Sequence, residues 1–159
     1  MISCRDFIPA YSELFKFLEK KGGKEAVHGY WCFLSDKFLG NLDDLVAKNG
    51  IKGCWQYWTH TLNEEAADFT MEVNEEEGWF RILLHQCPSM QRLIDTKHIE
   101  PYENYCQHCD VIYRRVLDKY GLQSDLDLST CKEARCSALI RTKEAVARGL
   151  PLDAATRKP

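Results

Sequence analysis

The segment that decides the fold is residues 67–85, ADFTMEVNEEEGWFRILLH, where the spacing of apolar residues changes from helical to alternating. Every second residue is apolar over 69–73, and from Trp79 onward the run is almost continuously apolar. The acidic stretch 74–78 between them is typical of a turn. The segment therefore predicts a β-hairpin, whose second strand carries on one face Trp79, Arg81, Leu83, His85 and Cys87.

The chain before this hairpin has the apolar spacing of helices. Apolar residues recur three or four positions apart over 12–21, 24–48 and 51–65, and Gly22-Gly23 and Asn49-Gly50 separate these runs. The pattern predicts three helices that end at the two glycine breaks. The rings of the third run at positions 55, 57 and 58 are either packed core or an aromatic wall for a ligand.

The chain after the hairpin predicts two helices and two more strands. Pro88 ends the hairpin, a short helix covers 89–95, and a longer one covers 101–120. Alternation then indicates strands near 126–128 and 136–140, joined by the loop 132–135. We expect a single α+β domain over residues 1–142, mostly helical over 1–65, with an antiparallel sheet of about four strands covered by helices. Residues 143–159 are expected to form a weakly ordered tail.

Composition narrows the class of protein. The net charge of −3 argues against nucleic acid as a partner. The sequence has no apolar run of eighteen residues, so we expect no membrane span. The N-terminal residues lack the pattern of a signal peptide, which favours a cytoplasmic protein whose cysteines are reduced.

Cysteine and histidine gather in one part of the chain. Five of the eight cysteines lie within fifty residues: Cys87, Cys106, Cys109, Cys131 and Cys136. On the helix expected over 101–120, Cys106, Cys109, Asp110 and Tyr113 share one face, whereas His108 points elsewhere unless the helix starts irregularly. Cys131 and Cys136 are expected to face each other across the last hairpin.

Three interpretations of this cluster stay open. The first is a metal site, for example zinc, held by Cys106, Cys109, Cys87 and Cys136. The second is a catalytic site, with Cys87 at the start of a helix expected to have a lowered pKa. The third is that the thiols are buried simply as small apolar side chains.

The motifs Cys87-Pro88, Cys106-x-x-Cys109-Asp110 and Cys136-x-x-Leu139-Ile140 resemble the L-2-amino-thiazoline-4-carboxylic acid hydrolase family. The resemblance covers about residues 79–140. The order of elements is also similar to the 4-vinyl reductase domain, which binds small molecules. The charged sequence 132–135 stands where the first family is expected to have a glycine-rich turn.

The first resemblance implies ring-opening hydrolysis of a small thiazoline carboxylate. That reaction needs a base or nucleophile, for which the sequence offers Cys106, Asp110, Cys87 and His85. It also needs groups that hold the substrate, for which the sequence offers Arg81, Arg135, Tyr113 and Trp79. The second resemblance implies a non-catalytic domain for a small molecule or metal. A homodimer through the aromatic helices is a further expectation.

Overall fold

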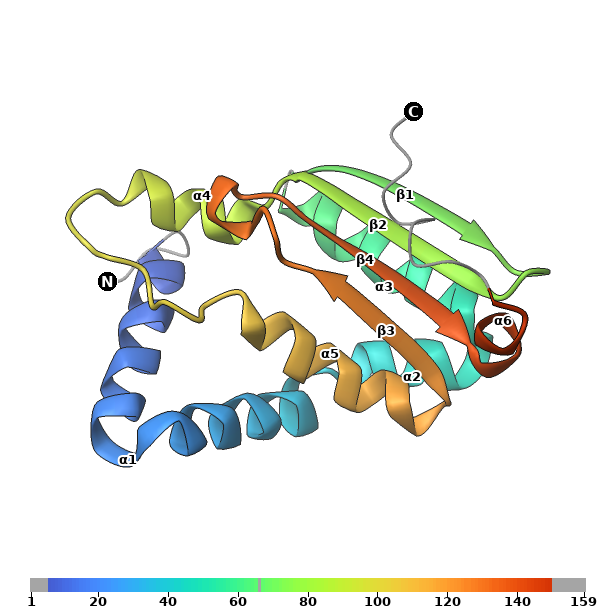
Figure 1. Cartoon of the computed structure of the whole chain (residues 1–159), viewed down its shortest axis with the longest axis horizontal. Coiled ribbons are helices and arrows are strands. Elements are labelled where there is room, and N and C mark those ends of the chain that lie inside the picture. The colour runs from blue at the N-terminus through green and yellow to red at the C-terminus, as the bar shows by residue number, and fades with distance from the viewer. Residues whose placement is uncertain (1–5, 66, 150–159) are drawn as a thin grey trace.

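The computed structural model describes residues 6–65 and 67–149. Its elements, shown in Figure 1, are α1 (Phe7–Phe38), α2 (Gly40–Asn49), α3 (Ile51–Glu64), β1 (Asp68–Asn74), β2 (Trp79–Gln86), α4 (Pro88–Asp95), α5 (Gln107–Lys119), β3 (Leu122–Asp127), the 3₁₀ turn Cys131–Glu133, β4 (Cys136–Thr142) and α6 (Lys143–Ala147). None of the helices within these described ranges combines the length and apolar character that crossing a membrane requires.

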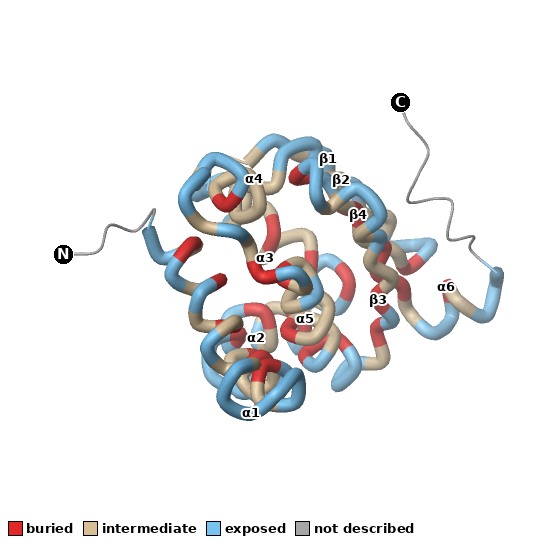
Figure 2. The backbone as a smooth tube through the Cα atoms, turned by 60° about the vertical axis from the view of Figure 1, so that its left-hand side comes forward, coloured by how far each residue is buried: buried red, intermediate tan, exposed pale blue. Residues whose placement is uncertain are grey.

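The four strands form one antiparallel sheet in the order β1-β2-β4-β3. β1 and β2 are the predicted hairpin, and β4 pairs with β2 through Phe80 opposite Ile140 and Ile82 opposite Ala138. Helices α1, α3 and α5 lie on one side of this sheet (Figure 2). The α+β class, the four antiparallel strands and the helical covering are therefore confirmed.

Strand β2 turns Phe80 and Ile82 toward the helices. Both side chains are almost wholly buried in the apolar core, whereas His85 on the alternate face is exposed. Arg81 shares that alternate face and pairs with Glu72 of β1. The face that runs from Trp79 to His85 is thus the outer face of the sheet, because an apolar residue at even positions gains more from burial than a charged one at odd positions.

The predicted helix break at Gly22-Gly23 is confirmed within α1. The backbone of both glycines is non-helical, and Gly23 has a positive φ of 70° that glycine tolerates without a steric penalty, so α1 consists of two helical limbs joined by a kink. Figure 1 shows the two limbs of α1 meeting at an angle. A second break, at Leu39, was not predicted, and it divides the single helix expected over 24–48 into the second limb of α1 and α2.

Both limbs of α1 are tied to the second half of the chain. In the first limb, the Ser12 hydroxyl accepts a hydrogen bond from the Tyr102 backbone N–H at 2.8 Å. In the second limb, the Ser35 hydroxyl donates to the Ile112 carbonyl of α5 at 2.7 Å. Both serines are buried. The bend therefore lets one helix support the loop before α5 and α5 itself.

The core lies between the sheet and the helices. Its fully or almost fully buried members include Phe15, Trp31, Leu42, Cys54, Trp58, Phe80, Leu93, Val116, Leu117 and Ile140. On α1, the large side chains of Phe17, Phe33 and Phe38 remain exposed instead. The homodimer expected from the aromatic helices stays a prediction.

The segment that follows β4 begins with a short helix, where a weakly ordered tail was expected. Residues Lys143–Ala147 form α6, and the Thr142 hydroxyl caps its start by accepting a hydrogen bond from the Ala145 N–H at 3.2 Å. A threonine at this position satisfies a backbone donor that the first turn leaves free. The expectation of a tail is wrong over this helix, and residues 150–159 lie outside the described part of the chain.

Candidate functional site

A cavity of about 380 Å³ lies between the inner face of the sheet, helices α3 and α5, and the start of α4. Its apolar walls are formed by Ile8, Trp58, Leu62, Ile82, Leu84, Leu126, Ala138 and Ile140. Its polar groups include Tyr57, Cys87, Ser89, His108, Cys109, Asp110, Tyr113, Ser124 and Cys136. The cavity is thus lined both by aromatic residues of α3 and by residues of the cysteine-rich segment.

The start of α5 determines which side chains reach the cavity. The helix begins at Gln107 rather than at residue 101, with Cys106 as its N-cap and tight turns before it. His108 and Cys109 therefore occupy the first turn, and both line the cavity. His108 was expected to point elsewhere unless the helix began irregularly, and this condition is met, because residues 101–106 are not part of the helix.

The His108 ring is held in one orientation. Its Nδ1 lies 2.5 Å from the Tyr105 carbonyl oxygen, and its Nε2 lies 3.5 Å from the Cys109 Sγ. A carbonyl only accepts hydrogen bonds, so Nδ1 carries the proton. Burial lowers the pKa of His108 below its ordinary 6.5, so the ring is neutral at pH 7. The lone pair of Nε2 consequently faces the Cys109 thiol.

The thiols of the cluster are protonated at neutral pH. Burial, with a contribution from the Asp110 charge, raises the pKa of Cys109 from 9.0 to about 12. Burial likewise raises the pKa of Cys136 to about 12 and raises the pKa of Cys106. A thiolate in this hollow would lose its hydration without gaining a cation.

Cys87 contradicts the expectation of a lowered pKa. It is the N-cap of α4, and the backbone N–H groups of Ser89 and Met90 do lower its pKa. Burial is the larger influence, so the pKa of Cys87 is raised overall. The helix start stabilises a thiolate less than the apolar surroundings destabilise it.

The structure brings together most of the sulfur groups that the sequence singled out. Cys87, Cys109 and Cys136 line the cavity, and Cys106 lies beside it, hydrogen-bonded to Cys131. Cys131 sits in the 3₁₀ turn between β3 and β4, so its described partner is Cys106 rather than Cys136. The seven cysteines of the described residues are free thiols.

The set expected to hold zinc is not arranged as a metal site. Among residues 6–65 and 67–149, no three side chains of His, Cys, Asp or Glu are grouped so that they could hold a metal ion. Cys106, Cys109, Cys87 and Cys136 therefore share a neighbourhood without forming a coordination shell.

Four of the expected site residues lie away from the cavity. His85 is exposed and its Nε2 lies 2.8 Å from the Thr70 hydroxyl on the outer face. Arg81 contacts Glu72 at 2.6 Å on that same face, and the Trp79 indole N–H donates to Glu77 at 2.6 Å. Arg135 is exposed in the turn before β4. The roles assigned to His85, Arg81, Trp79 and Arg135 in one site are therefore corrected.

Asp110 and Tyr113 do line the cavity, as expected from their shared helix face. The Asp110 carboxylate accepts hydrogen bonds from the Arg114 guanidinium, with the shortest distance at 2.5 Å. Both hydrogen bonds are accepted by one carboxylate oxygen, Oδ1. Among the described residues that line the cavity, none is a lysine or an arginine.

Tyr113 was expected in the site from the sequence, but its pairing with Tyr57 was not. Tyr57 of α3 and Tyr113 of α5 are hydrogen-bonded to each other at the cavity wall. Burial raises the pKa of both, so both remain protonated donors. The run of three rings in α3 was the available signal. Tyr57 and Trp58 line the cavity, and Trp58 also belongs to the packed core; an aromatic wall for a ligand stays a prediction.

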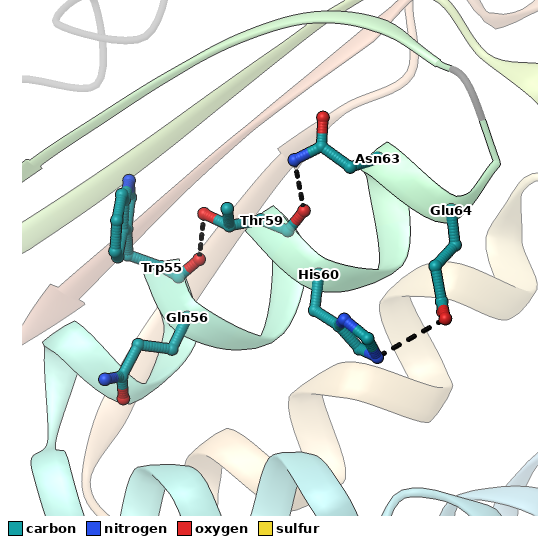
Figure 3. Close-up of a pocket in the computed structure, with 6 residues that line it drawn as sticks. All are labelled: Trp55, Gln56, Thr59, His60, Asn63 and Glu64. Carbon is teal, nitrogen blue, oxygen red and sulfur yellow. Dashed lines mark hydrogen bonds and ion pairs between the residues drawn. The ribbon is translucent and has the colours of Figure 1, made fainter.

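The third ring of that run, Trp55, lies at a different place. It borders an open hollow along α3 together with Gln56, Thr59, His60, Asn63 and Glu64 (Figure 3). Several of the polar groups drawn there are paired within the helix, for example His60 with Glu64 at 3.5 Å, whereas Gln56 accepts a hydrogen bond from Asn49 of α2. A single exposed helix face of this kind has no second wall to hold a ligand.

Comparison with known proteins adds no relative. Protein-family models, curated proteins and solved structures were each compared with the chain, and none of them matches.

Proposed function

We propose that this protein binds a small, uncharged and largely apolar organic molecule in the cavity between the sheet and helices α3 and α5. The observation that carries the proposal is the lining of this cavity of about 380 Å³. Its volume falls in the range of about 300–1,000 Å³ that is typical of small-molecule sites. We place this activity in a reducing compartment such as the cytoplasm, because the described cysteines are free thiols.

The lining also indicates the charge of the ligand. Branched and aromatic side chains from both layers form most of the wall, and the described lining offers no cationic side chain. The described lining has two carboxylates: Asp110 is already paired with Arg114, and Glu65 is exposed to water. A charged ligand would lose its hydration there without a partner, so an uncharged ligand is favoured.

Polar groups at a few points would orient such a ligand. The Tyr57 and Tyr113 hydroxyls supply protonated donors, and the Ser124 hydroxyl lies on the sheet side of the cavity. An apolar molecule with one carbonyl or ether oxygen fits this distribution.

The test uses two probes that share one aromatic skeleton. N-phenyl-1-naphthylamine is uncharged, and 8-anilino-1-naphthalenesulfonate carries a sulfonate. We expect the uncharged probe to bind with a stoichiometry of one and at least tenfold more tightly, measured by fluorescence titration. Equal affinity, or binding of the sulfonate alone, would contradict the proposal.

A matched pair of variants locates the probe. Ala138 lies on the inner face of β4 and lines the cavity, whereas Gln123 is exposed on the outer face of β3. Ala138→Leu fills the hollow and should weaken binding of the uncharged probe at least tenfold. Gln123→Leu adds a similar apolar side chain outside and should leave the affinity unchanged. Loss of binding in both variants, or in neither, would argue against this cavity.

Ring-opening hydrolysis of a thiazoline carboxylate is the second candidate function. It is favoured by Cys87, Cys109 and Asp110, which match the family resemblance and line one cavity. It ranks second because the substrate carboxylate would find no cation among the described lining residues. Incubation with L-2-amino-thiazoline-4-carboxylate, followed by mass spectrometry of the ring-opened product, tests it. Turnover by the wild-type protein that Asp110→Asn abolishes would promote this candidate to first place.

A further inference from the structure

We propose that Cys109 and His108 act as nucleophile and general base, and that they cleave an ester or thioester bond of the molecule bound in the cavity. This inference rests on the proposed binding function and adds an acyl-transfer activity to it. The substrate class is an uncharged carboxylic ester or thioester with an apolar acyl chain.

The relative placement of the two side chains supports the proposal. Cys109 Sγ and His108 Nε2 are 3.5 Å apart, within reach of an S–H···N hydrogen bond. The other ring nitrogen donates to the Tyr105 carbonyl, which fixes the tautomer that leaves Nε2 free to accept a proton. The Cys109 thiol, the His108 ring and the Tyr105 carbonyl therefore form a hydrogen-bonded chain of nucleophile, base and orienting group.

The packing of the His108 ring keeps this arrangement in place. The ring lies among aromatic neighbours, with centroid distances of 4.8 Å to Tyr105 and 5.9 Å to Tyr11 and to Phe15. A base that is locked in one orientation does not need to be ordered during the reaction.

A second Cys–His contact in the same chain shows why the cavity matters. On α1, Cys32 Sγ lies 3.7 Å from His28 Nδ1, but neither residue lines the cavity. His108 is the one histidine among the described residues that line it. The two pairs have similar chemistry and differ in whether a bound molecule can be presented to the sulfur.

The tyrosine pair can stabilise the charge that develops on the substrate oxygen. Tyr57 and Tyr113 both line the cavity, and the charge of a Cys109 thiolate would raise the pKa of each, which places both rings near the sulfur. Only one of the two hydroxyl protons is used in their mutual hydrogen bond. The other is available to an oxyanion on the acyl carbon.

The reaction balances without a metal or cofactor. Cys109 Sγ attacks the acyl carbon, its proton passes to His108 Nε2, and the carbonyl electron pair moves to oxygen. The tetrahedral intermediate collapses, the bond to the alkoxide or thiolate breaks, and the leaving group takes the proton from His108. Water then attacks the acyl-cysteine while His108 accepts its proton. Collapse expels the sulfur, which is reprotonated, and the net reaction consumes one water and yields an acid and an alcohol or thiol.

Several titratable groups surround the pair. Asp110 and Tyr113 face it from α5, Tyr57 from α3, Cys87 from the start of α4, Tyr11 from α1 and Tyr105 from the preceding loop. Asp110 disfavours a free Cys109 thiolate. Attack therefore depends on proton removal by His108 in the same step rather than on a thiolate formed in advance.

The first experiment locates the acyl group. The full chain is mixed with p-nitrophenyl butyrate, quenched in acid and digested, and the acylated peptide is identified by mass spectrometry. We expect butyryl on Cys109 and at least a tenfold slower acylation in His108→Asn. Asparagine keeps a donor for the Tyr105 carbonyl but lacks the second nitrogen. The matched controls His28→Asn and Cys32→Ser should react at the wild-type rate.

The second experiment uses pH to separate a base from a structural role. In the wild-type protein the acylation rate should be flat from pH 7 to 9, because His108 is already neutral. In His108→Asn the rate should rise about tenfold per pH unit, because only the thiolate then reacts.

Two outcomes would overturn the proposal. One is an identical pH profile in the wild-type protein and in His108→Asn, and the other is acylation of Cys32 or another cysteine in place of Cys109. Binding of N-phenyl-1-naphthylamine to the same preparations separates the causes. If the probe binds and Cys109 is not acylated, only the acyl-transfer activity fails; if the probe does not bind, the proposed binding function fails as well.

Discussion

Cys54 shows how strongly the interior of this protein opposes a charged sulfur. The side chain lies on α3 with 0% of its surface exposed, and burial raises its pKa from 9.0 to about 12. In the unfolded chain the thiol would titrate at its ordinary value. The folded protein therefore keeps this proton at pH values where the unfolded chain releases it.

The free energy of unfolding should consequently fall as the pH rises above 9. Cys54 contributes stability that is complete below its unfolded pKa of 9.0 and is lost progressively up to the folded pKa of about 12. Its share of the loss between pH 9 and 10 is about 1 kcal/mol. Urea denaturation of the wild-type protein and of Cys54→Ala at both pH values measures it.

Comparing how the free energy of unfolding of each protein changes with pH removes the constant loss of stability that truncating Cys54 causes. Cys54→Ala should lose about 1 kcal/mol less than the wild-type protein between the two pH values. Parallel losses in the two proteins would show that the folded Cys54 thiol titrates normally.

At this scale the sequence indicated which residue types would gather but not which atoms would meet. The spacing of Cys109, Asp110 and Tyr113 placed them correctly on one helix face. His85 was given the role of a base although it lies on the exposed face, and His108 was set aside. The difference depends on where α5 begins, which is set by turns between residues 102 and 106 rather than by periodicity.

Among the elements, α2 and α3 approach each other most closely at Gly53. A Cβ atom built there would lie 2.2 Å from the Leu45 carbonyl oxygen of α2, a backbone atom that cannot move independently. Only a hydrogen atom fits at this crossing, so the geometry requires glycine at position 53. Gly29 of α1, also inside a helix, has nothing within 4 Å of the same position.

Gly53→Ala and Gly29→Ala should therefore have opposite effects on stability. The first should lower the free energy of unfolding by about 1–3 kcal/mol or more, because the two helices must separate. The second should raise it by about 0.5–1 kcal/mol, because alanine is the better helix former. Thermal and urea denaturation of both variants checks the signs, and a loss at both sites would show that helix packing is not what distinguishes them.

Element boundaries were harder to predict than element types. The hairpin and α3 were placed within a few residues. The division at Gly22-Gly23 was predicted correctly, since the backbone is non-helical there, but the second break at Leu39 was missed. Glycine marks the first break because it lowers helix propensity, whereas no glycine pair or proline in the sequence marks Leu39 in the same way.

At the scale of the whole molecule, the two faces of the sheet differ: the inner face packs against the apolar core, whereas the outer face carries polar and charged side chains around a buried Leu139. Phe80 is 0% exposed on the inner face and packs 5.7 Å from the Trp58 ring, measured between centroids. Leu83 is only partly buried on the outer face, three residues along the same strand. These two positions report which face of β2 supports the core.

Phe80→Ala should lower the free energy of unfolding by about 3–5 kcal/mol, since it leaves a cavity between the two layers. Leu83→Ala should cost clearly less, because its side chain is only partly removed from water. Chemical denaturation at pH 7 measures both variants. The reverse order would mean that the strand turns its other face toward the helices.

The α+β class was predictable because it depends on repeated local patterns that agree with one another. Alternation in 69–73, the turn at 74–78 and the later strand near 136–140 all indicate an antiparallel sheet. The cavity was not predictable in the same way, since its wall combines residues far apart in sequence, such as Ile8 and Ala138. Such a hollow arises only when all layers have packed.

The gathering of thiols around one hollow also bears on how the chain can be refolded. The thiols come from three separate stretches of the chain, which carry Cys87, then Cys106 and Cys109, and then Cys131 and Cys136. These stretches meet only once β2, β4 and α5 are assembled. In denaturant these sulfurs become accessible and ionise more easily, so air oxidation would join stretches that have not yet found their places. Recovery of the native protein should therefore require a reductant until the sheet has formed.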